Sequence, residues 1–259
     1  MPEVTNYKQG TPSWLDLATT DMGAAEKFYG KLFGWQCKRE PAGDGQFYSM
    51  QYLKGKSVAG IFKQSIEQAE QGVPPNWTTY ITVEDVDSTA AKAKNLDGAV
   101  IAEPFDVFDN GRMAVLQDPE GASFSLWQPN KHIGAELVNE PGTVIWNELV
   151  ADDPEKLSPF YASLLDIEMK DMEGMPEYKL FTVEGNSVAG IFKKTEQLQG
   201  LPSHWSIYFA VEDCDATVDK TKSLGGESVK PAADTPMGRF AVLKDPQGAV
   251  FQVISYSAG

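Results

Sequence analysis

The chain has 259 residues, of which 42% are hydrophobic and 11% aromatic, enough to fill the cores of two ordinary domains. Acidic residues outnumber basic ones by 37 to 22, and the formal net charge of −15 argues against nucleic acid and anionic membranes as partners. No signal layout opens the chain, and no apolar run approaches the roughly 18 residues that span a bilayer. We therefore expect a cytoplasmic protein.

The first predicted elements follow the order β-α-β-β-β. A strand over 12–18 comes first and is followed by a capped helix; in the matching helix of the second half, Asp153 is predicted to be the cap. Later strands over 47–53 and 57–62 are joined at Gly55, a residue suited to a tight turn. This order indicates one compact module rich in strands.

A second module of the same order begins at Trp77. It is predicted to contain a strand, a helix that is capped by Asp87 and ends near Asn95, and further strands. Loop-forming residues then dominate 129–142, where hydrophobic periodicity lapses. We therefore predict a first domain over residues 11–128, followed by a linker over 129–142.

The remaining half of the chain repeats the first half in the same order. The hexapeptide VAGIFK occurs at both 58–63 and 188–193. Matching landmarks lie 132 residues apart near the start of each copy, at Trp14 and Trp146, and 127 residues apart near its end. A separation that only shrinks indicates short loop deletions in one duplicated domain, so we predict a second domain over residues 143–256.

One ordered set of residues occurs in each half. An Asp follows the first strand, a Phe-Tyr pair begins seven residues later on the helix, and Asp-Pro-x-Gly precedes the final strand. This set resembles the vicinal oxygen chelate superfamily, which includes glyoxalase I, extradiol dioxygenases, and fosfomycin and bleomycin resistance proteins. The residues that carry the resemblance are Asp21, Phe28, Tyr29, Asp118–Gly121, Asp153, Phe160, Tyr161 and Asp245–Gly248.

The resemblance implies an α+β fold. Two tandem domains are expected, each a cup-shaped mixed sheet formed by paired βαβββ modules with helices outside. The stretches Gly10–Trp14 and Asn147–Leu149 are also similar to an actinobacterial two-domain branch, which includes a mycobacterial antigen and proteins labelled as hydroxylases in antibiotic gene clusters. One fold carries many functions, so the function has to be argued from the cups.

Enzymes of this superfamily hold a divalent metal through His and Glu side chains at four strand positions of a domain. None of the corresponding residues here is a His, Glu or Asp, the side chains that supply nitrogen and carboxylate ligands. His132 falls in the linker and His204 matches Asn76, so neither takes a ligand position. We expect no metal and no other cofactor. The eight positions are Trp14, Gly60, Thr78, Ser125, Trp146, Gly190, Ser206 and Gln252.

Aromatic residues and a single carboxylate replace the ligands in each cup. Because side chains alternate across a strand, Asp16 shares a face with Trp14, and Glu148 shares one with Trp146. A concave aromatic surface with few polar groups suits a small hydrophobic or aromatic molecule. The candidate binding residues are Trp14, Asp16, Phe62, Thr78, Tyr80, Ser125 and Trp127 in the first cup, and Trp146, Glu148, Phe192, Ser206, Tyr208 and Gln252 in the second.

Several of these residues have structural alternatives. The two tryptophans could merely plug vestigial cups. Asp16 and Glu148 are candidates for general bases, or else they are hydrogen-bonded structural carboxylates. Arg112 and Arg239 suit either an anionic ligand or a salt bridge beside a turn. Trp77 and Trp205 alternate onto the opposite face of their strands, where they are predicted to pack against helices.

Three classes of function therefore remain open. The leading interpretation, by analogy with the resistance and sequestration branch, is metal-free binding of a small hydrophobic or aromatic molecule, by a monomer or homodimer. The main alternative is an enzyme of the glyoxalase, lyase, hydroxylase or dioxygenase type. The third is a structural or antigen-like protein whose cups bind nothing.

Overall fold

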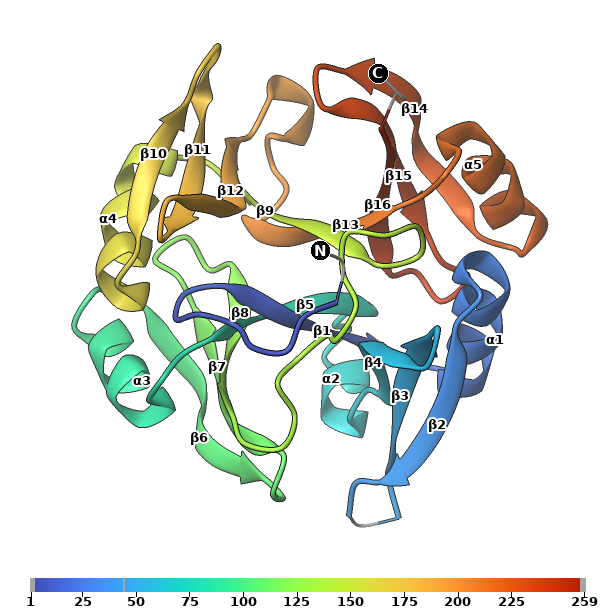
Figure 1. Cartoon of the computed structure of the whole chain (residues 1–259), viewed down its shortest axis with the longest axis horizontal. Coiled ribbons are helices and arrows are strands. Elements are labelled where there is room, and N and C mark those ends of the chain that lie inside the picture. The colour runs from blue at the N-terminus through green and yellow to red at the C-terminus, as the bar shows by residue number, and fades with distance from the viewer. Residues whose placement is uncertain (1–2, 44, 257–259) are drawn as a thin grey trace.

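A computed structural model describes residues 3–43 and 45–256 and contains two eight-stranded sheets, one in each half of the chain (Figure 1). No helix of these residues is long and apolar enough to cross a membrane. The elements of the first half are β1 (Pro12–Thr19), α1 (Met22–Phe33), β2 (Gln36–Pro41), β3 (Phe47–Leu53), β4 (Lys56–Lys63), α2 (Ile66–Glu70), β5 (Asn76–Thr82), α3 (Val86–Lys94), β6 (Ala99–Val107), β7 (Gly111–Gln117) and β8 (Ser123–Pro129).

The second half repeats this series of elements. A short 3-10 helix, η1, replaces α2. The elements are β9 (Val144–Ala151), α4 (Pro154–Leu165), β10 (Glu168–Met172), β11 (Met175–Val183), β12 (Asn186–Lys193), η1 (Glu196–Leu198), β13 (His204–Ala210), α5 (Cys214–Ser223), β14 (Glu227–Thr235), β15 (Gly238–Lys244) and β16 (Val250–Ser255).

Both sheets have the same strand order. The first reads β2-β3-β4-β1-β5-β8-β7-β6 and the second β10-β11-β12-β9-β13-β16-β15-β14. In each sheet two βαβββ modules meet at their first strands, which run antiparallel, with Trp14 opposite Tyr80 and Trp146 opposite Tyr208. The two tryptophans thus occupy equivalent places. The predicted tandem pair of α+β domains is confirmed.

The helix caps are partly as predicted. The predicted cap Asp153 accepts the N–H of Lys156 at the start of α4, and the equivalent Asp21 accepts the N–H of Ala24 at the start of α1. The predicted cap at Asp87 is wrong, because α3 begins two residues earlier and Asp85 accepts the N–H of Ser88. The equivalent Asp213 caps α5 in the same way. Asp87 instead lies in the first turn of α3, where its carboxylate forms an ion pair with Arg112 of β7.

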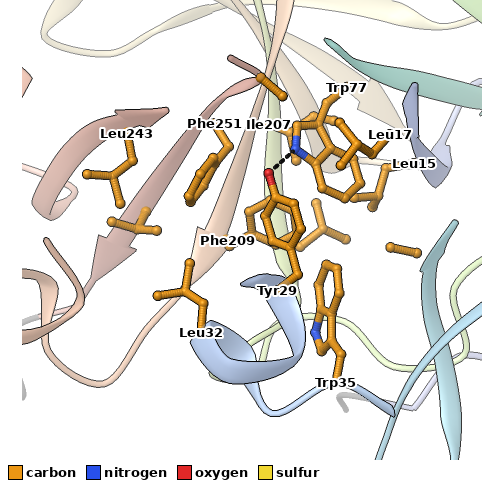
Figure 2. Close-up of a cluster of buried hydrophobic side chains, with 14 of the residues drawn as sticks. Leu15, Leu17, Tyr29, Leu32, Trp35, Trp77, Ile207, Phe209, Leu243 and Phe251 are labelled. Atoms are coloured by element: carbon orange, nitrogen blue, oxygen red, sulfur yellow. Dashed lines mark hydrogen bonds between the residues drawn. The ribbon is translucent and has the colours of Figure 1, made fainter. Parts of the chain in front are cut away.

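Two hydrophobic cores lie against the outer faces of the sheets, and each core contains residues of both domains. A helix of each domain packs against the sheet of the other. Phe28 and Tyr29 of α1 pack edge-on against Phe251 of β16, with ring centroids 6.3 and 5.6 Å apart. Figure 2 shows this cluster, in which Tyr29 lies between the strands of the second domain and Trp77 of β5. The predicted helix-packing role of Trp77 is confirmed, since it lies in this core with 7% of its surface exposed.

A buried tyrosine of each helix reaches the Asp-Pro-x-Gly turn of the other domain. The Tyr29 hydroxyl donates to Asp245 Oδ2 at 3.0 Å and accepts the indole N–H of Trp77. The equivalent Tyr161 hydroxyl donates to Asp118 Oδ2 at 2.9 Å. The other oxygen of each aspartate accepts backbone N–H groups of its own turn. The two motifs that signal the family therefore bind each other across the domain boundary.

These hydrogen bonds predict a stability effect in Tyr29→Phe and Tyr161→Phe. Each change leaves a buried aspartate oxygen and an indole N–H without a partner, which costs about 1–3 kcal/mol for each unsatisfied group. Urea unfolding followed by circular dichroism should show a lower midpoint for both variants. Tyr256→Phe alters an exposed side chain and is the control. Wild-type midpoints for both core variants would show that the contacts contribute no stability.

Candidate functional site

The strand register brings the predicted residues of the first cup onto one face. We call this the inner face of the first sheet, because it points away from the shared core. Asp16 lies between Gly60 of β4 and Thr78 of β5, and Trp14 lies beside Tyr80. Beyond them, Tyr80 pairs with Ser125, and Thr82 with Trp127. The alternation of side chains along each strand thus predicted this face.

Asp16 is the polar centre of the inner face of the first sheet and is only 5% exposed. Its Oδ1 accepts the Trp14 indole N–H at 2.8 Å and the Tyr48 hydroxyl, while Oδ2 accepts the Tyr80 hydroxyl at 2.8 Å. A Cβ on Gly60 would overlap both the Tyr48 hydroxyl and the Asp16 carboxylate. Glycine is therefore required there so that Tyr48 can reach Asp16.

Tyr48 of β3 was not predicted as part of this site. Its place on this face follows from the pairing of β3 with β4, in which Tyr48 lies opposite Phe62. That pairing depends on a hairpin whose register shifts between Gln51 and Tyr52, a feature that alternation within one strand does not reveal.

The linker covers the inner face of the first sheet. Ala135 donates its N–H to the Ser13 carbonyl at 2.8 Å and joins a buried cluster with Trp14 and Trp127. The His132 ring lies edge-on to Trp14, with centroids 4.4 Å apart, and its carbonyl accepts the Trp127 indole N–H. In Figure 1 the yellow-green linker crosses the first sheet on its way to β9. Trp14 is therefore buried between its own sheet and the linker.

His132 sits in the linker, as the sequence indicated, but it also lies against the first cup. Burial lowers its pKa to about 4, so the ring is neutral at physiological pH. Its Nε2 is buried and has no hydrogen-bond partner among the described residues. A neutral ring against Trp14 contributes packing without a charge.

The inner face of the second sheet repeats the central carboxylate. Glu148 Oε2 accepts the Tyr178 hydroxyl and Oε1 accepts the Tyr208 hydroxyl, both at 2.8 Å. The Trp146 indole N–H donates to Tyr178 and not to the carboxylate. Burial raises the pKa of Glu148, and the hydrogen bonds from Tyr208 and Tyr178 oppose this rise in part. Tyr178, like Tyr48, was not predicted.

The second inner face is more exposed than the first. Trp146, Glu148 and Tyr208 are half-buried, whereas their equivalents Trp14, Asp16 and Tyr80 are buried. The linker accounts for the greater burial of the first inner face, because it packs against Trp14, Tyr80 and Trp127. The aromatic rings of the second inner face, including the unpredicted Phe240 of β15 beside Tyr208, are Trp146, Tyr178, Phe192, Tyr208 and Phe240.

Gln252, on β16 of this face, is a polar side chain whose hydrogen-bonding capacity is only partly used. The Gln252 amide N–H donates to Ser206 Oγ at 3.3 Å. The residue is only 7% exposed, and its Oε1 is buried without a partner among the described residues. The register places Gln252 beside Tyr208, on the same face as Glu148. The second inner face therefore contains an acceptor that the protein leaves unused.

Neither inner face fits the divalent metal that the fold family implies. The described residues contain no group of three His, Cys, Asp or Glu side chains that could hold an ion. Each face offers one carboxylate, and both oxygens of that carboxylate already accept hydrogen bonds from aromatic side chains. A divalent transition metal needs several nitrogen, oxygen or sulfur ligands, and the remaining side chains at these positions are neutral.

The other candidates outside the cups have structural roles. Arg112 forms ion pairs with Asp87 and Asp106, at 2.6 and 2.9 Å. Arg239 repeats this arrangement in the second domain. Trp205 lies in the core and donates its indole N–H to Tyr161. These contacts agree with the salt-bridge and helix-packing interpretations.

Comparison with known proteins identifies the family. Residues 11–126 match the glyoxalase/bleomycin resistance protein/dioxygenase superfamily, and residues 145–254 match a glyoxalase-like domain. The chain belongs to this superfamily. "Putative glyoxylase CFP32" of Mycobacterium tuberculosis is 45% identical over 258 residues, covering 98% of both chains. "Anthracycline biosynthesis protein DnrV" of Streptomyces peucetius is 35% identical, covering 99% of this chain and 97% of its own.

Solved structures show the same fold at low sequence identity. The Mn(II)-bound glyoxalase of Novosphingobium aromaticivorans superimposes with a TM-score of 0.65 at 15% identity, covering 96% of this chain and 83% of that one. The 2,3-dioxygenase LapB of Pseudomonas sp. KL28 gives 0.63 at 11% identity, covering 96% and 93%. At such identities the likeness extends to the fold alone.

The environment of Asp16 predicts an unusual titration. Burial raises its pKa to about 6, although the hydrogen bonds from Tyr48, Tyr80 and Trp14 oppose the rise. Carbon-13 NMR of the carboxyl groups should therefore contain a resonance with a midpoint near pH 6 that is missing in Asp16→Asn. Because the folded pKa exceeds the unfolded value of about 4, protonation stabilises the fold, and this contribution is lost as pH rises from about 4 to 6. A midpoint near pH 4 would contradict the prediction.

Proposed function

We propose that this protein binds a planar aromatic molecule on the inner face of its second sheet, without a metal. The observation that carries the proposal is the half-buried state of Trp146, Phe192 and Tyr208 around Glu148. Large aromatic surfaces that stay partly open to solvent gain free energy when a flat apolar ligand covers them. At the equivalent places of the first sheet, Trp14, Asp16 and Tyr80 are already buried beneath the linker.

The chemistry of the face suits a flat ring system with a polar group. Stacking and edge contacts with aromatic rings supply about 0.5–1.5 kcal/mol beyond the burial of area. Glu148 and the unused oxygen of Gln252 are acceptors that would orient a hydrogen-bond donor of the ligand. The name of the relative DnrV connects that protein with the biosynthesis of anthracyclines, which are fused-ring aromatic compounds. It supports a fused-ring ligand for this chain.

A second candidate is an enzyme that transfers protons through Glu148. The raised pKa of this carboxyl, held between two tyrosine hydroxyls, is typical of a general acid or base. In this reaction Glu148 would take a proton from a carbon or hydroxyl of the bound substrate and return it to another atom. The relative named as a glyoxylase favours this class. Loss of turnover in Glu148→Gln with retained binding would separate catalysis from sequestration.

The binding proposal predicts different effects for two matched variants. Phe192 and Phe62 occupy equivalent positions, on β12 and β4, and both are half-buried. With 2-(hydroxymethyl)anthraquinone as the probe in isothermal titration calorimetry, Phe192→Ala should weaken binding about tenfold, the equivalent of about 1.4 kcal/mol. Phe62→Ala should bind as the wild type does.

Trp146→Ala gives a second measure of the same surface. Loss of this half-buried ring should weaken binding of the probe by about tenfold or more, while circular dichroism confirms that the variant remains folded. Wild-type affinity in both Trp146→Ala and Phe192→Ala would overturn the proposed site. Weakening by Phe62→Ala alone would place the site on the first sheet.

A further inference from the structure

Among the described residues, Glu148 has no cationic partner. No lysine or arginine of residues 3–43 and 45–256 forms an ion pair with it. Each of its oxygens accepts one hydrogen bond, Oε2 from Tyr178 and Oε1 from Tyr208. A carboxylate has about four acceptor positions, so roughly half of its capacity is unused. An unpaired carboxylate among aromatic rings is costly to bury, and a positive ligand group would offset that cost.

The comparison with Asp16 indicates that this capacity is available to a ligand. Asp16 accepts three hydrogen bonds, from Trp14, Tyr48 and Tyr80, and is 5% exposed beneath the linker. Glu148 has one more methylene group, accepts two hydrogen bonds from the described residues and is half-buried. The same scaffold therefore satisfies its carboxylate internally in the first domain and leaves it partly free in the second.

The rings around Glu148 suit a cation as well as a flat apolar group. The faces of Trp, Tyr and Phe attract ammonium groups that lie within about 6 Å of the ring centroid. One such contact already exists at the edge of this face, where the Lys230 ammonium lies 4.7 Å from the Phe240 centroid. The net charge of −15 also favours the approach of cations over anions. Gln252 Oε1 offers a further acceptor on the same face.

We propose that the ligand of the second sheet carries an organic cation, a protonated amine or quaternary ammonium, placed against Glu148. Its aromatic part would lie against Trp146 and Phe192. This inference rests on the proposed function and adds the charge class of the ligand. The unpaired carboxylate, the aromatic rings and the buried, unpartnered oxygen of Gln252 support it together.

Three anthraquinone probes of the same shape test the charge preference. 2-(Aminomethyl)anthraquinone is cationic at pH 7.5, 2-(hydroxymethyl)anthraquinone is neutral, and anthraquinone-2-carboxylate is anionic. Calorimetry with the full chain should give the amine about tenfold tighter binding than the alcohol, with the carboxylate weakest. Glu148→Gln should weaken the amine more than the alcohol and so reduce the preference for the amine to less than threefold.

Glu177→Gln is the matched control for general electrostatics. Glu177 precedes Tyr178 on β11 and its side chain is 69% exposed. Within the described part of the chain it forms one ion pair, a 3.6 Å contact with Lys193. The variant removes the same charge as Glu148→Gln but not the carboxylate between the tyrosines. It should keep the tenfold preference for the amine. Loss of that preference in Glu177→Gln would assign it to the overall negative potential and overturn the proposed contact.

The outcomes separate this inference from the proposed function. Equal affinity of wild type for all three probes, each weakened by Trp146→Ala, would overturn the cation proposal and leave aromatic binding intact. A preference for the amine that survives Glu148→Gln would overturn it as well. Absence of binding by all three probes would overturn both proposals.

Discussion

The hydrogen bond between a helix tyrosine of one domain and the turn aspartate of the other organises this molecule. Tyr29 and Tyr161 are fully buried, and their hydroxyl protons are accepted by Asp245 and Asp118, respectively. Because each acceptor lies in the opposite domain, neither domain satisfies its own tyrosine. The hydroxyl also accepts an indole N–H, which fixes the ring against the sheet of its own domain.

This exchange of helices determines which sheet faces are open to a ligand. The outer faces of both sheets are occupied by the two shared cores, which leaves the inner faces as the candidate binding surfaces of the sheets. The duplication gives both inner faces a central carboxylate with tyrosine donors, yet the linker reaches only the first of them. The covered face acts as a packed centre around Asp16, and the partly open face around Glu148 becomes the candidate site. One duplicated scaffold therefore supports two different environments for the same constellation.

Much of the candidate site follows from strand periodicity. Trp14, Asp16 and Tyr80 share a face because side chains alternate along a strand, and their counterparts share one for the same reason. Tyr48 and Tyr178 were missed because they reach the carboxylates from neighbouring strands, across a glycine that has no side chain of its own. The cap of α3 was misplaced because two aspartates compete there, and the arginine that holds the second one comes from a distant strand.

The sequence by itself determined the two tandem domains, the module order, the faces of the central strands and the lack of metal ligands at the expected positions. Each of these rests on repetition or on local alternation, which a linear chain displays directly. Only the tertiary structure decided that Phe28 and Tyr29 pack in the other domain, that His132 and Ala135 cover Trp14, and that Glu148 keeps unused acceptor positions. Those facts depend on contacts between residues far apart in the chain, and local periodicity carries no record of such contacts.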